Sequence, residues 1–186
     1  AEDLATELVR IMPRPLDHVF FSDSGSTSVE VALKMALGYF SNRGEPRHRS
    51  LVLEHSYHGD TIGGMSVGAR GVFNRAYAPL LFDVETIAFP AEGAEHATLD
   101  ALDRACARRD AAAFIVEPLI LGAGGMLIYS AKVLVQMRAI CESHGVLFIA
   151  DEVITGFGRL GQPFGTQVFG LEPDMLTVAK MLTSAY

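Results

Sequence analysis

The sequence predicts an α/β fold: a mainly parallel sheet with helices on both of its faces. Two observations support this prediction. Short apolar runs alternate along the chain with longer stretches of helical periodicity, and two of the runs, 113–116 and 146–150, are continuously apolar. Such runs are typical of strands that are buried on both faces. The stretches between the runs are long enough for the right-handed crossovers that join parallel strands.

The first predicted helix lies in the stretch "FFSDSGSTSVEVALKMALGYF", residues 20–40. Thr27 and Glu30 have the spacing of a capping box, and Glu30 and Lys34 that of an i,i+4 ion pair. Its apolar residues repeat on one helix face: Val29, Ala32, Leu33, Ala36, Leu37 and Phe40. Residues 51–53 then predict a short strand, 84–89 a weaker strand, and 99–108 a helix.

The second half of the chain continues the alternation. The run 113–116 predicts a buried strand, and 131–144 predicts a helix that Gly145 ends. The run 146–150 predicts a second buried strand, and 175–179 a third. The sequence has no internal repeat and no linker, so one domain is expected for its 186 residues.

Composition excludes several functional classes. Apolar residues make up 49% of the chain, which is too many for a disordered protein and indicates that some surface faces a partner. The net charge of −7 without a basic patch argues against nucleic acid, and no apolar run is long enough to predict a membrane span. Two cysteines, Cys106 and Cys141, indicate a reducing, cytoplasmic compartment. Because the chain begins with Ala1 and stops at Tyr186, we expect a piece of a longer protein.

Chemically versatile residues follow the predicted strands. Tyr57 and Glu117 come after the first and third strands, Asp151 follows the run 146–150, and Lys180 follows the run 175–179. Ligands bind at the carboxyl ends of strands in such sheets, so these side chains are expected to converge. A lysine buried there can form a Schiff base with an aldehyde. Taken singly, however, Lys180 could simply reach solvent, and Asp151 could cap a turn or pair with Arg159.

Asp151 and Lys180 together match the needs of pyridoxal phosphate. A pyridine ring between them would place its ring nitrogen on Asp151 and its aldehyde on Lys180. The cofactor's phosphate would suit the start of the first helix, where N–H groups are free, Gly25 permits close approach, and Ser24, Ser26 and Thr27 offer hydroxyls. Tyr57 would supply a flat face for the ring, or else cover the edge of the core.

Five stretches of the sequence, which together cover most of the chain, carry motifs of a known family: "DSGSTSVEVALKMA" (23–36), "SYHGDTIGGMSV" (56–67), "IVEPLILGAGGM" (115–126), "LFIADEVITGFGRLG" (147–161) and "PDMLTVAKMLTSAY" (173–186). These motifs resemble those of class III aminotransferases, which belong to the fold-type I pyridoxal-phosphate enzymes. Within that family the chain is most similar to the adenosylmethionine-8-amino-7-oxononanoate aminotransferases of biotin synthesis.

The resemblance implies roles for individual residues. Lys180 would bind the cofactor covalently and move a proton during catalysis, and Asp151 would pair with the pyridinium nitrogen. Glu117 would lie near the substrate. The remaining implied contacts are Gly25 and Ser26 with the phosphate, Val153 with the ring, and Tyr57 with both ring and substrate. No metal is implied.

The resemblance also implies an assembly and a domain. Residues 1–186 would be part of the large, aspartate aminotransferase-like cofactor domain of a homodimer, without the small C-terminal domain and its substrate-binding arginine. The substrates would be an amino donor and a keto acceptor. One departure favours ω-amino acid:pyruvate aminotransferases instead, because Thr183-Ser184-Ala185 replaces the usual Thr-Gly-Gly of the biotin enzymes. An alternative of another class is a catalytically silent fragment that provides only an assembly surface.

Two other kinds of site are disfavoured. Glycines at 122, 124 and 125 could form a nucleotide loop, but Glu117 and Pro118 separate them from the preceding strand. Glu54, His55 and His58 match no standard metal spacing, and we expect these histidines to be solvated loop residues.

Overall fold

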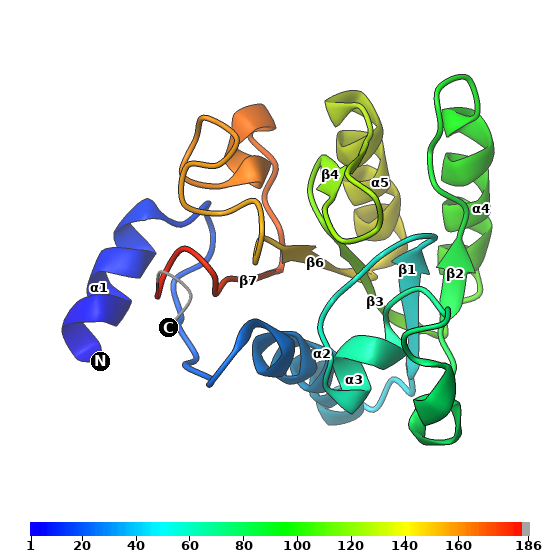
Figure 1. The fold of residues 1–186 in the computed structure, drawn as a ribbon, viewed down its shortest axis with the longest axis horizontal. Coiled ribbons are helices and arrows are strands. Elements are labelled where there is room, and N and C mark those ends of the chain that lie inside the picture. Colours follow the sequence, from blue (N-terminus) through cyan, green and yellow to red (C-terminus); the bar gives the residue numbers. More distant parts are fainter. Residues whose placement is uncertain (184–186) are drawn as a thin grey trace.

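The computed structural model describes residues 1–183 and confirms the predicted parallel sheet (Figure 1). The strands lie in the spatial order β2-β1-β3-β6-β7, and every neighbouring pair is parallel. Their bounds are β1 (Arg49–Leu53), β2 (Glu85–Ile87), β3 (Ala111–Val116), β6 (Leu147–Asp151) and β7 (Met175–Thr177).

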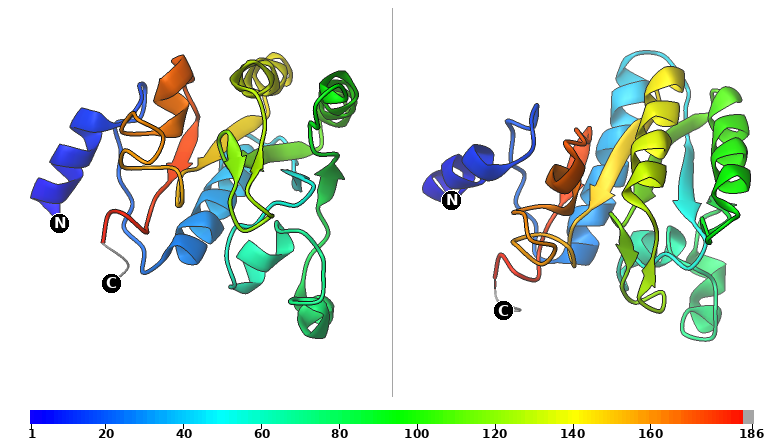
Figure 2. Two further views of the ribbon diagram at one scale, coloured as in Figure 1. Left: turned by 45° about the horizontal axis from the view of Figure 1, so that its top comes forward. Right: turned by 90° about the horizontal axis from the view of Figure 1, so that it is seen from above.

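Helices cover both faces of this sheet, as predicted. Helices α4 (Glu95–Ala107) and α5 (Ala131–His144) pack together on one face, and α2 (Gly25–Asn42) crosses the other with α3 (Ile62–Ser66) beside it (Figures 1 and 2). Helix α1 (Glu2–Ile11) lies beyond the β7 edge. The site described below therefore rests on a sheet whose central strands are held from both sides.

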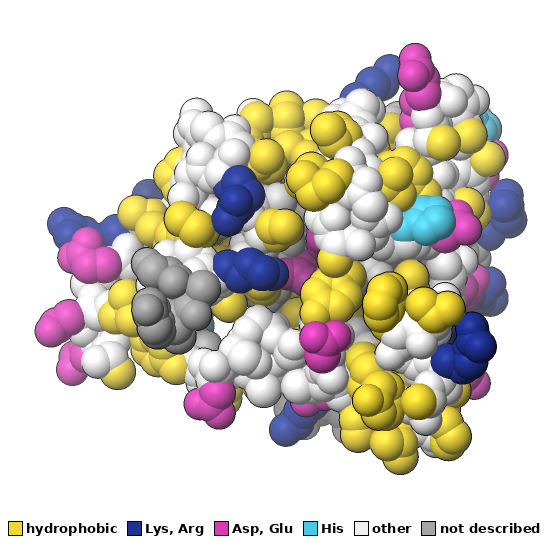
Figure 3. All heavy atoms as spheres, viewed as in Figure 1, with side chains coloured by type: hydrophobic (Ala, Val, Ile, Leu, Met, Phe, Trp, Pro, Cys, Tyr) yellow, Lys and Arg dark blue, Asp and Glu magenta, His cyan; other side chains and the backbone are white. Residues whose placement is uncertain are grey.

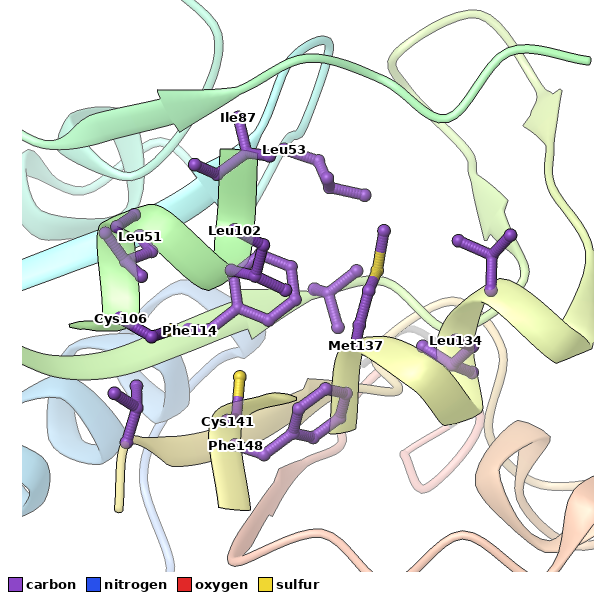
Figure 4. Packing of buried hydrophobic residues seen from close by; sticks show 14 of the residues in the cluster. Leu51, Leu53, Ile87, Leu102, Cys106, Phe114, Leu134, Met137, Cys141 and Phe148 are labelled. Carbon is purple, nitrogen blue, oxygen red and sulfur yellow. The ribbon is translucent and has the colours of Figure 1, made fainter. Parts of the chain in front are cut away.

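The core is divided between the two faces by the pleat of the strands. In β1, Leu51 and Leu53 point toward α4 and α5, whereas Val52 points toward α2. Strand β6 alternates in the same way, and so does β3 from Ala113 to Val116. Figure 4 shows the first side of this core, with Leu102 of α4 and Met137 of α5 among the strand residues. The continuous apolar runs in the sequence are thus explained by burial on both faces.

The structure adds short elements that the sequence analysis did not predict. Their bounds are η1 (Arg75–Leu80), η2 (Gly165–Phe169) and an antiparallel hairpin of β4 (Ile120–Leu121) and β5 (Leu127–Ile128). Helix α1 also had no prediction. Elements of two to six residues are too short to show a hydrophobic period.

Several predicted boundaries need correction. The helix predicted at 99–108 begins at Glu95, the strand at 84–89 is limited to Glu85–Ile87, and the strand at 175–179 ends at Thr177. Helix α5 matches its predicted bounds, and Gly145 ends it in the left-handed region at φ 65°. Glycine adopts this conformation without the cost that a Cβ imposes.

The predicted capping box is wrong. Ser24, not Thr27, is the N-cap of α2: its Oγ accepts from the Thr27 N–H at 3.1 Å, and Thr27 Oγ1 accepts from the Ser24 N–H at 2.8 Å. Glu30 instead accepts a hydrogen bond from the Gly63 N–H at 2.5 Å, and no ion pair to Lys34 is found in the described part of the chain. Glu30, which the sequence pattern assigned to the helix cap, therefore makes a tertiary contact with the segment that carries Gly63.

The two cysteines are free thiols, buried in α4 and α5. Across residues 1–183, none of the helices has the length and apolar character needed to cross a bilayer.

Candidate active site

A pocket of about 380 Å³ opens at the carboxyl ends of the central strands. Its position follows from the topology. The chain runs from β1 to β2 on one side and then crosses back past β1 to β3 on the other, and ligand sites lie where the strand order reverses in this way. Every predicted site residue lines this one pocket, although they come from five separate segments: Gly25, Ser26, Tyr57, Glu117, Asp151, Val153 and Lys180.

Asp151 ends β6 and is 3% exposed. Its Oδ1 accepts hydrogen bonds from the Val153 N–H and the Thr177 hydroxyl, both at 3.1 Å. Its Oδ2 lies 2.6 Å from Nδ1 of His58. The carboxylate is thus held by donors on both oxygens. The bond from the Val153 N–H is the turn cap that the sequence left open, whereas no ion pair with Arg159 is found among residues 1–183.

His58 is the main residue of the site that sequence reasoning missed. We expected a solvated loop histidine, but the His58 side chain is completely buried beside Asp151. Its Nε2 is also buried and has no hydrogen-bond partner among residues 1–183. The sequence could have pointed to His58, because it lies five residues after the end of a buried strand and directly after Tyr57.

Glu117, which follows β3, is a second buried carboxylate in the pocket. Its Oε1 accepts from the Tyr57 N–H at 3.2 Å and its Oε2 from the Gly122 N–H at 2.9 Å. Burial raises the pKa of Glu117 above its ordinary value, and the nearby His58 partly opposes this shift. The glycine loop at 122–125 therefore braces Glu117, which is not the arrangement of a nucleotide loop.

Tyr57 borders the open side of the pocket and is 38% exposed. Its hydroxyl donates to Oδ2 of Asp60 at 2.9 Å. Partial burial, followed by this bond, raises the pKa of Tyr57 to about 12. The phenol therefore stays protonated across the physiological range and presents a neutral ring.

The start of α2 forms the opposite wall. The Ser24 cap satisfies Thr27 and Ser28, which leaves the N–H groups of Gly25 and Ser26 without partners in the described structure. The hydroxyls of Ser24 and Thr27, predicted to face a phosphate, are engaged in the cap. The Ser26 Oγ accepts from the Asp60 N–H at 3.1 Å, so its hydrogen remains available to donate.

Lys180 lies in the pocket, but not as predicted. Strand β7 ends at Thr177, and Lys180 follows three residues later as an exposed side chain. The expectation of a lysine buried at a strand end is wrong, because Lys180 lies in the turn after β7, and the alternative that it reaches solvent describes it. Ser184 and Ala185, which form part of the departure from the biotin enzymes noted in the sequence, lie outside the described residues.

A third buried acid, Glu152, lies next to Asp151 and supports the pocket from behind. Its carboxylate is 1% exposed and accepts hydrogen bonds from the N–H groups of Gly165 and Thr166 and from the hydroxyls of Thr155 and Thr166, at 2.6 to 2.9 Å. These contacts fix the loop that carries Val153. Glu54, the acid that the sequence analysis weighed for a metal site with His55 and His58, is exposed, and its Oε1 lies 3.9 Å from Nε2 of His55.

Comparisons with known proteins agree with this geometry. The family model "Aminotransferase class-III" matches residues 1–186. An adenosylmethionine-8-amino-7-oxononanoate aminotransferase of Synechococcus elongatus is 48% identical over 194 residues. An omega-aminotransferase of Caulobacter vibrioides is 42% identical over 202 residues. Among solved structures, an amine transaminase from an uncultivated Pseudomonas species, in its PLP-bound form, superposes with a TM-score of 0.93 at 37% identity.

All three proteins are longer than this chain. The matches cover 100% of the chain in each case, but 46% of the Synechococcus protein and 45% of each of the other two. The chain therefore spans a little less than half the length of these relatives.

Proposed function

The chain belongs to the class-III aminotransferases, and on that premise we propose that its full-length protein transfers amino groups with pyridoxal phosphate as cofactor. The single observation that carries the proposal is the convergence in one pocket of a lysine, a buried carboxylate and an open helix N-terminus. Pyridoxal phosphate bears an aldehyde, a basic ring nitrogen and a phosphate, and each of these groups has a matching partner there.

The residues of the pocket fit this cofactor. The free N–H groups of Gly25 and Ser26 suit a phosphate, which the helix dipole also favours. A Cβ added at Gly25 would lie 3.0 Å from Cγ1 of Val153, so glycine leaves room that any other residue would take. Asp151, held by donors on both oxygens, suits a protonated ring nitrogen.

The proposed roles follow from these positions. Bound pyridoxal phosphate supplies an electron sink for negative charge that develops on the substrate. Lys180 Nζ would bind the cofactor and move the proton at the substrate carbon, while Asp151 would keep the ring nitrogen protonated. Val153 would pack on the ring, Tyr57 would border both ring and substrate, and Glu117 would face the substrate from the end of β3.

The proposed reaction is that of the biotin-synthesis relatives: transfer of an amino group from S-adenosylmethionine to 8-amino-7-oxononanoate. The higher identity to the Synechococcus protein supports this choice. An ω-amino acid:pyruvate reaction is the second candidate, supported by the Caulobacter relative and by Thr183-Ser184-Ala185. A screen of amino donors with the full-length protein separates the two.

We further propose that residues 1–186 are part of the large domain of a cytoplasmic homodimer. Two free buried thiols support a reducing compartment. An exposed apolar patch around η1, at the lower right of Figure 3, supports an interface; it comprises Val72, Phe73, Tyr77, Leu80 and Phe82. Sedimentation of the full-length protein at micromolar concentration tests the assembly, and a fully active monomer would contradict it.

The first prediction tests the lysine. In the full-length protein with pyridoxal phosphate, Lys180→Ala should abolish the visible absorbance of the bound cofactor and its covalent labelling by borohydride. The exposed Lys132 provides a matched control, so Lys132→Ala should keep both signals. A labelled peptide that maps to Lys34 or Lys132 would refute the assignment. Full turnover without any bound cofactor would refute the proposed function.

A further inference from the structure

Glu30 joins helix α2 to the segment that follows β1. Its Oε1 accepts a hydrogen bond from the Gly63 N–H at 2.5 Å. One helical turn earlier, on the same face of α2, the Ser26 Oγ accepts a hydrogen bond from the Asp60 N–H at 3.1 Å. The segment 60–63 is therefore attached to α2 at two points, and one of them, Ser26, lines the pocket.

Helix α3, which begins in this segment, depends on such contacts. It has only five residues, and two of them are Gly63 and Gly64. A helix this short is not stable in isolation, and glycine weakens it further. A Cβ added at Gly63 would nevertheless lie 2.6 Å from Cγ of Glu30. Glycine at position 63 therefore admits the Glu30 side chain, and the bond to Glu30 helps to hold α3 in place.

The position of α3 is passed on to the pocket through close backbone contacts. A Cβ added at Gly64 would lie 3.0 Å from the carbonyl oxygen of His58, so α3 packs directly on the segment 58–59. A Cβ added at Gly59 would in turn lie 2.6 Å from Cβ of Ser26. Together with the bond from the Asp60 N–H, these contacts leave the Ser26 side chain little freedom to move independently of α3.

We propose that Glu30 is a positioning residue, which acts through α3 and the segment 58–60 to hold the Ser26 hydroxyl in place for the cofactor's phosphate. The inference rests on the proposed function, because Ser26 is one of the groups that would bind the phosphate. Among the described residues, the lining of the pocket includes Ser26 but not Glu30, so Glu30 acts through its neighbours. Without the Glu30 carboxylate, the Gly63 N–H loses its acceptor and α3 loses one attachment to α2.

Pyridoxal offers a direct test, because it carries the aldehyde and the ring nitrogen of pyridoxal phosphate but no phosphate. The dissociation constants of both compounds are measured with the full-length protein from the visible absorbance of the bound form. Glu30→Ala should raise the dissociation constant of pyridoxal phosphate by about tenfold and that of pyridoxal by less than about twofold. Glu30→Gln keeps a carbonyl acceptor for the Gly63 N–H and should stay within about threefold of wild type for both. Glu142→Ala, a control on the surface, should match wild type.

Gly63→Ala tests the same contact from the opposite side, and it replaces Glu30→Ala if that variant does not fold. Its added methyl group displaces the Glu30 side chain, so it should weaken the binding of pyridoxal phosphate and spare that of pyridoxal. In the double variant the space beside residue 63 is free. Glu30→Ala combined with Gly63→Ala should therefore bind pyridoxal phosphate no more weakly than Glu30→Ala does.

The outcomes are distinguishable. An equal rise of the two dissociation constants would overturn the role of Glu30, because it describes a general loosening of the pocket rather than a loss at the phosphate. Wild-type binding in Glu30→Ala, additive losses in the double variant, or equal losses in Glu30→Gln and Glu30→Ala would also overturn it. A wild-type protein that binds neither compound would instead contradict the proposed function.

Discussion

At the scale of single residues, the pocket combines acids that differ in how they are stabilised. Asp151 has a histidine and two further donors, whereas Glu117 has two backbone N–H groups and lies 4% exposed. Burial therefore dominates at Glu117 and raises its pKa. A carboxyl group that holds its proton more tightly is suited to donate a hydrogen bond to a substrate.

The raised pKa of Glu117 predicts a pH dependence of stability. The unfolded chain releases this proton near the ordinary value of 4.5, whereas the folded chain keeps it to higher pH. The folded state then binds more protons than the unfolded state, so its stability falls as pH rises through this window. Glu117→Gln, which cannot titrate, should lose less stability than wild type between about pH 4 and pH 7 in urea unfolding.

The exposed Glu142 offers a matched control for this measurement. Glu142→Gln makes the same chemical change on the surface and should follow the wild-type pH dependence. A constant difference in stability between Glu117→Gln and wild type at every pH would show that Glu117 has no raised pKa.

At the scale of elements, the loop between β6 and η2 is the part of the site most dependent on one side chain. Glu152 receives four hydrogen bonds, two from the start of η2 and two from threonine hydroxyls on either side of the loop. Both oxygens are fully used. The loop carries Val153 and Ile154 into the pocket, so its anchoring and the shape of the site are linked.

Glu152→Gln should therefore destabilise the protein. The amide NH₂ group must face two donors, which breaks bonds and buries an unsatisfied group at a cost of about 1.5–3 kcal/mol. The midpoint of urea unfolding should fall, and cofactor affinity should fall with it because Val153 is displaced. A midpoint that matches that of the surface variant Glu142→Gln would show that the loop does not depend on this acid.

The elements also show what the sequence alone could predict. Strands β3 and β6 are buried on both faces, so their continuous apolar runs were reliable, and α5 ends where a glycine can adopt positive φ. The run at 175–179 looked equally apolar, but β7 is an edge strand, where an apolar residue need not be buried. The local sequence pattern does not show whether a strand lies at the centre or at the edge of the sheet.

In the candidate site, likewise, the residues at strand ends could be predicted from the sequence, whereas the tertiary contacts between them could not. Residues at strand ends were found because parallel strands share one carboxyl edge, which gave Tyr57, Glu117 and Asp151. The burial of His58 depends on Asp151, which lies 93 residues further along the chain. Ser24 and Thr27 form the capping box of α2, and Glu30 is bound to the Gly63 N–H instead. The burial of His58 and the bond of Glu30 are both tertiary contacts, which residue spacing along the chain cannot predict.

At the scale of the whole molecule, the candidate site lies at the carboxyl edge of the sheet, where some of its side chains reach the surface. The carboxyl edge carries the candidate cofactor residues, yet Tyr57 and Lys180 are exposed. Strand β7 pairs only with β6 among residues 1–183, which leaves a sheet edge open. The relatives that it matches are more than twice as long, since the chain covers 46% of the Synechococcus protein.

Residues 1–186 alone should therefore bind pyridoxal phosphate weakly and show no measurable transamination. The pocket presents groups for the cofactor, but orientation of the substrate accounts for up to about 7–11 kcal/mol of a barrier, and an open pocket supplies little of it. The assay uses purified, soluble residues 1–186 with excess pyridoxal phosphate and several amino donors, beside the full-length protein under identical conditions. Sustained turnover by the short chain, lost in its Lys180→Ala variant, would show instead that these residues suffice and that the rest of the protein contributes little to catalysis.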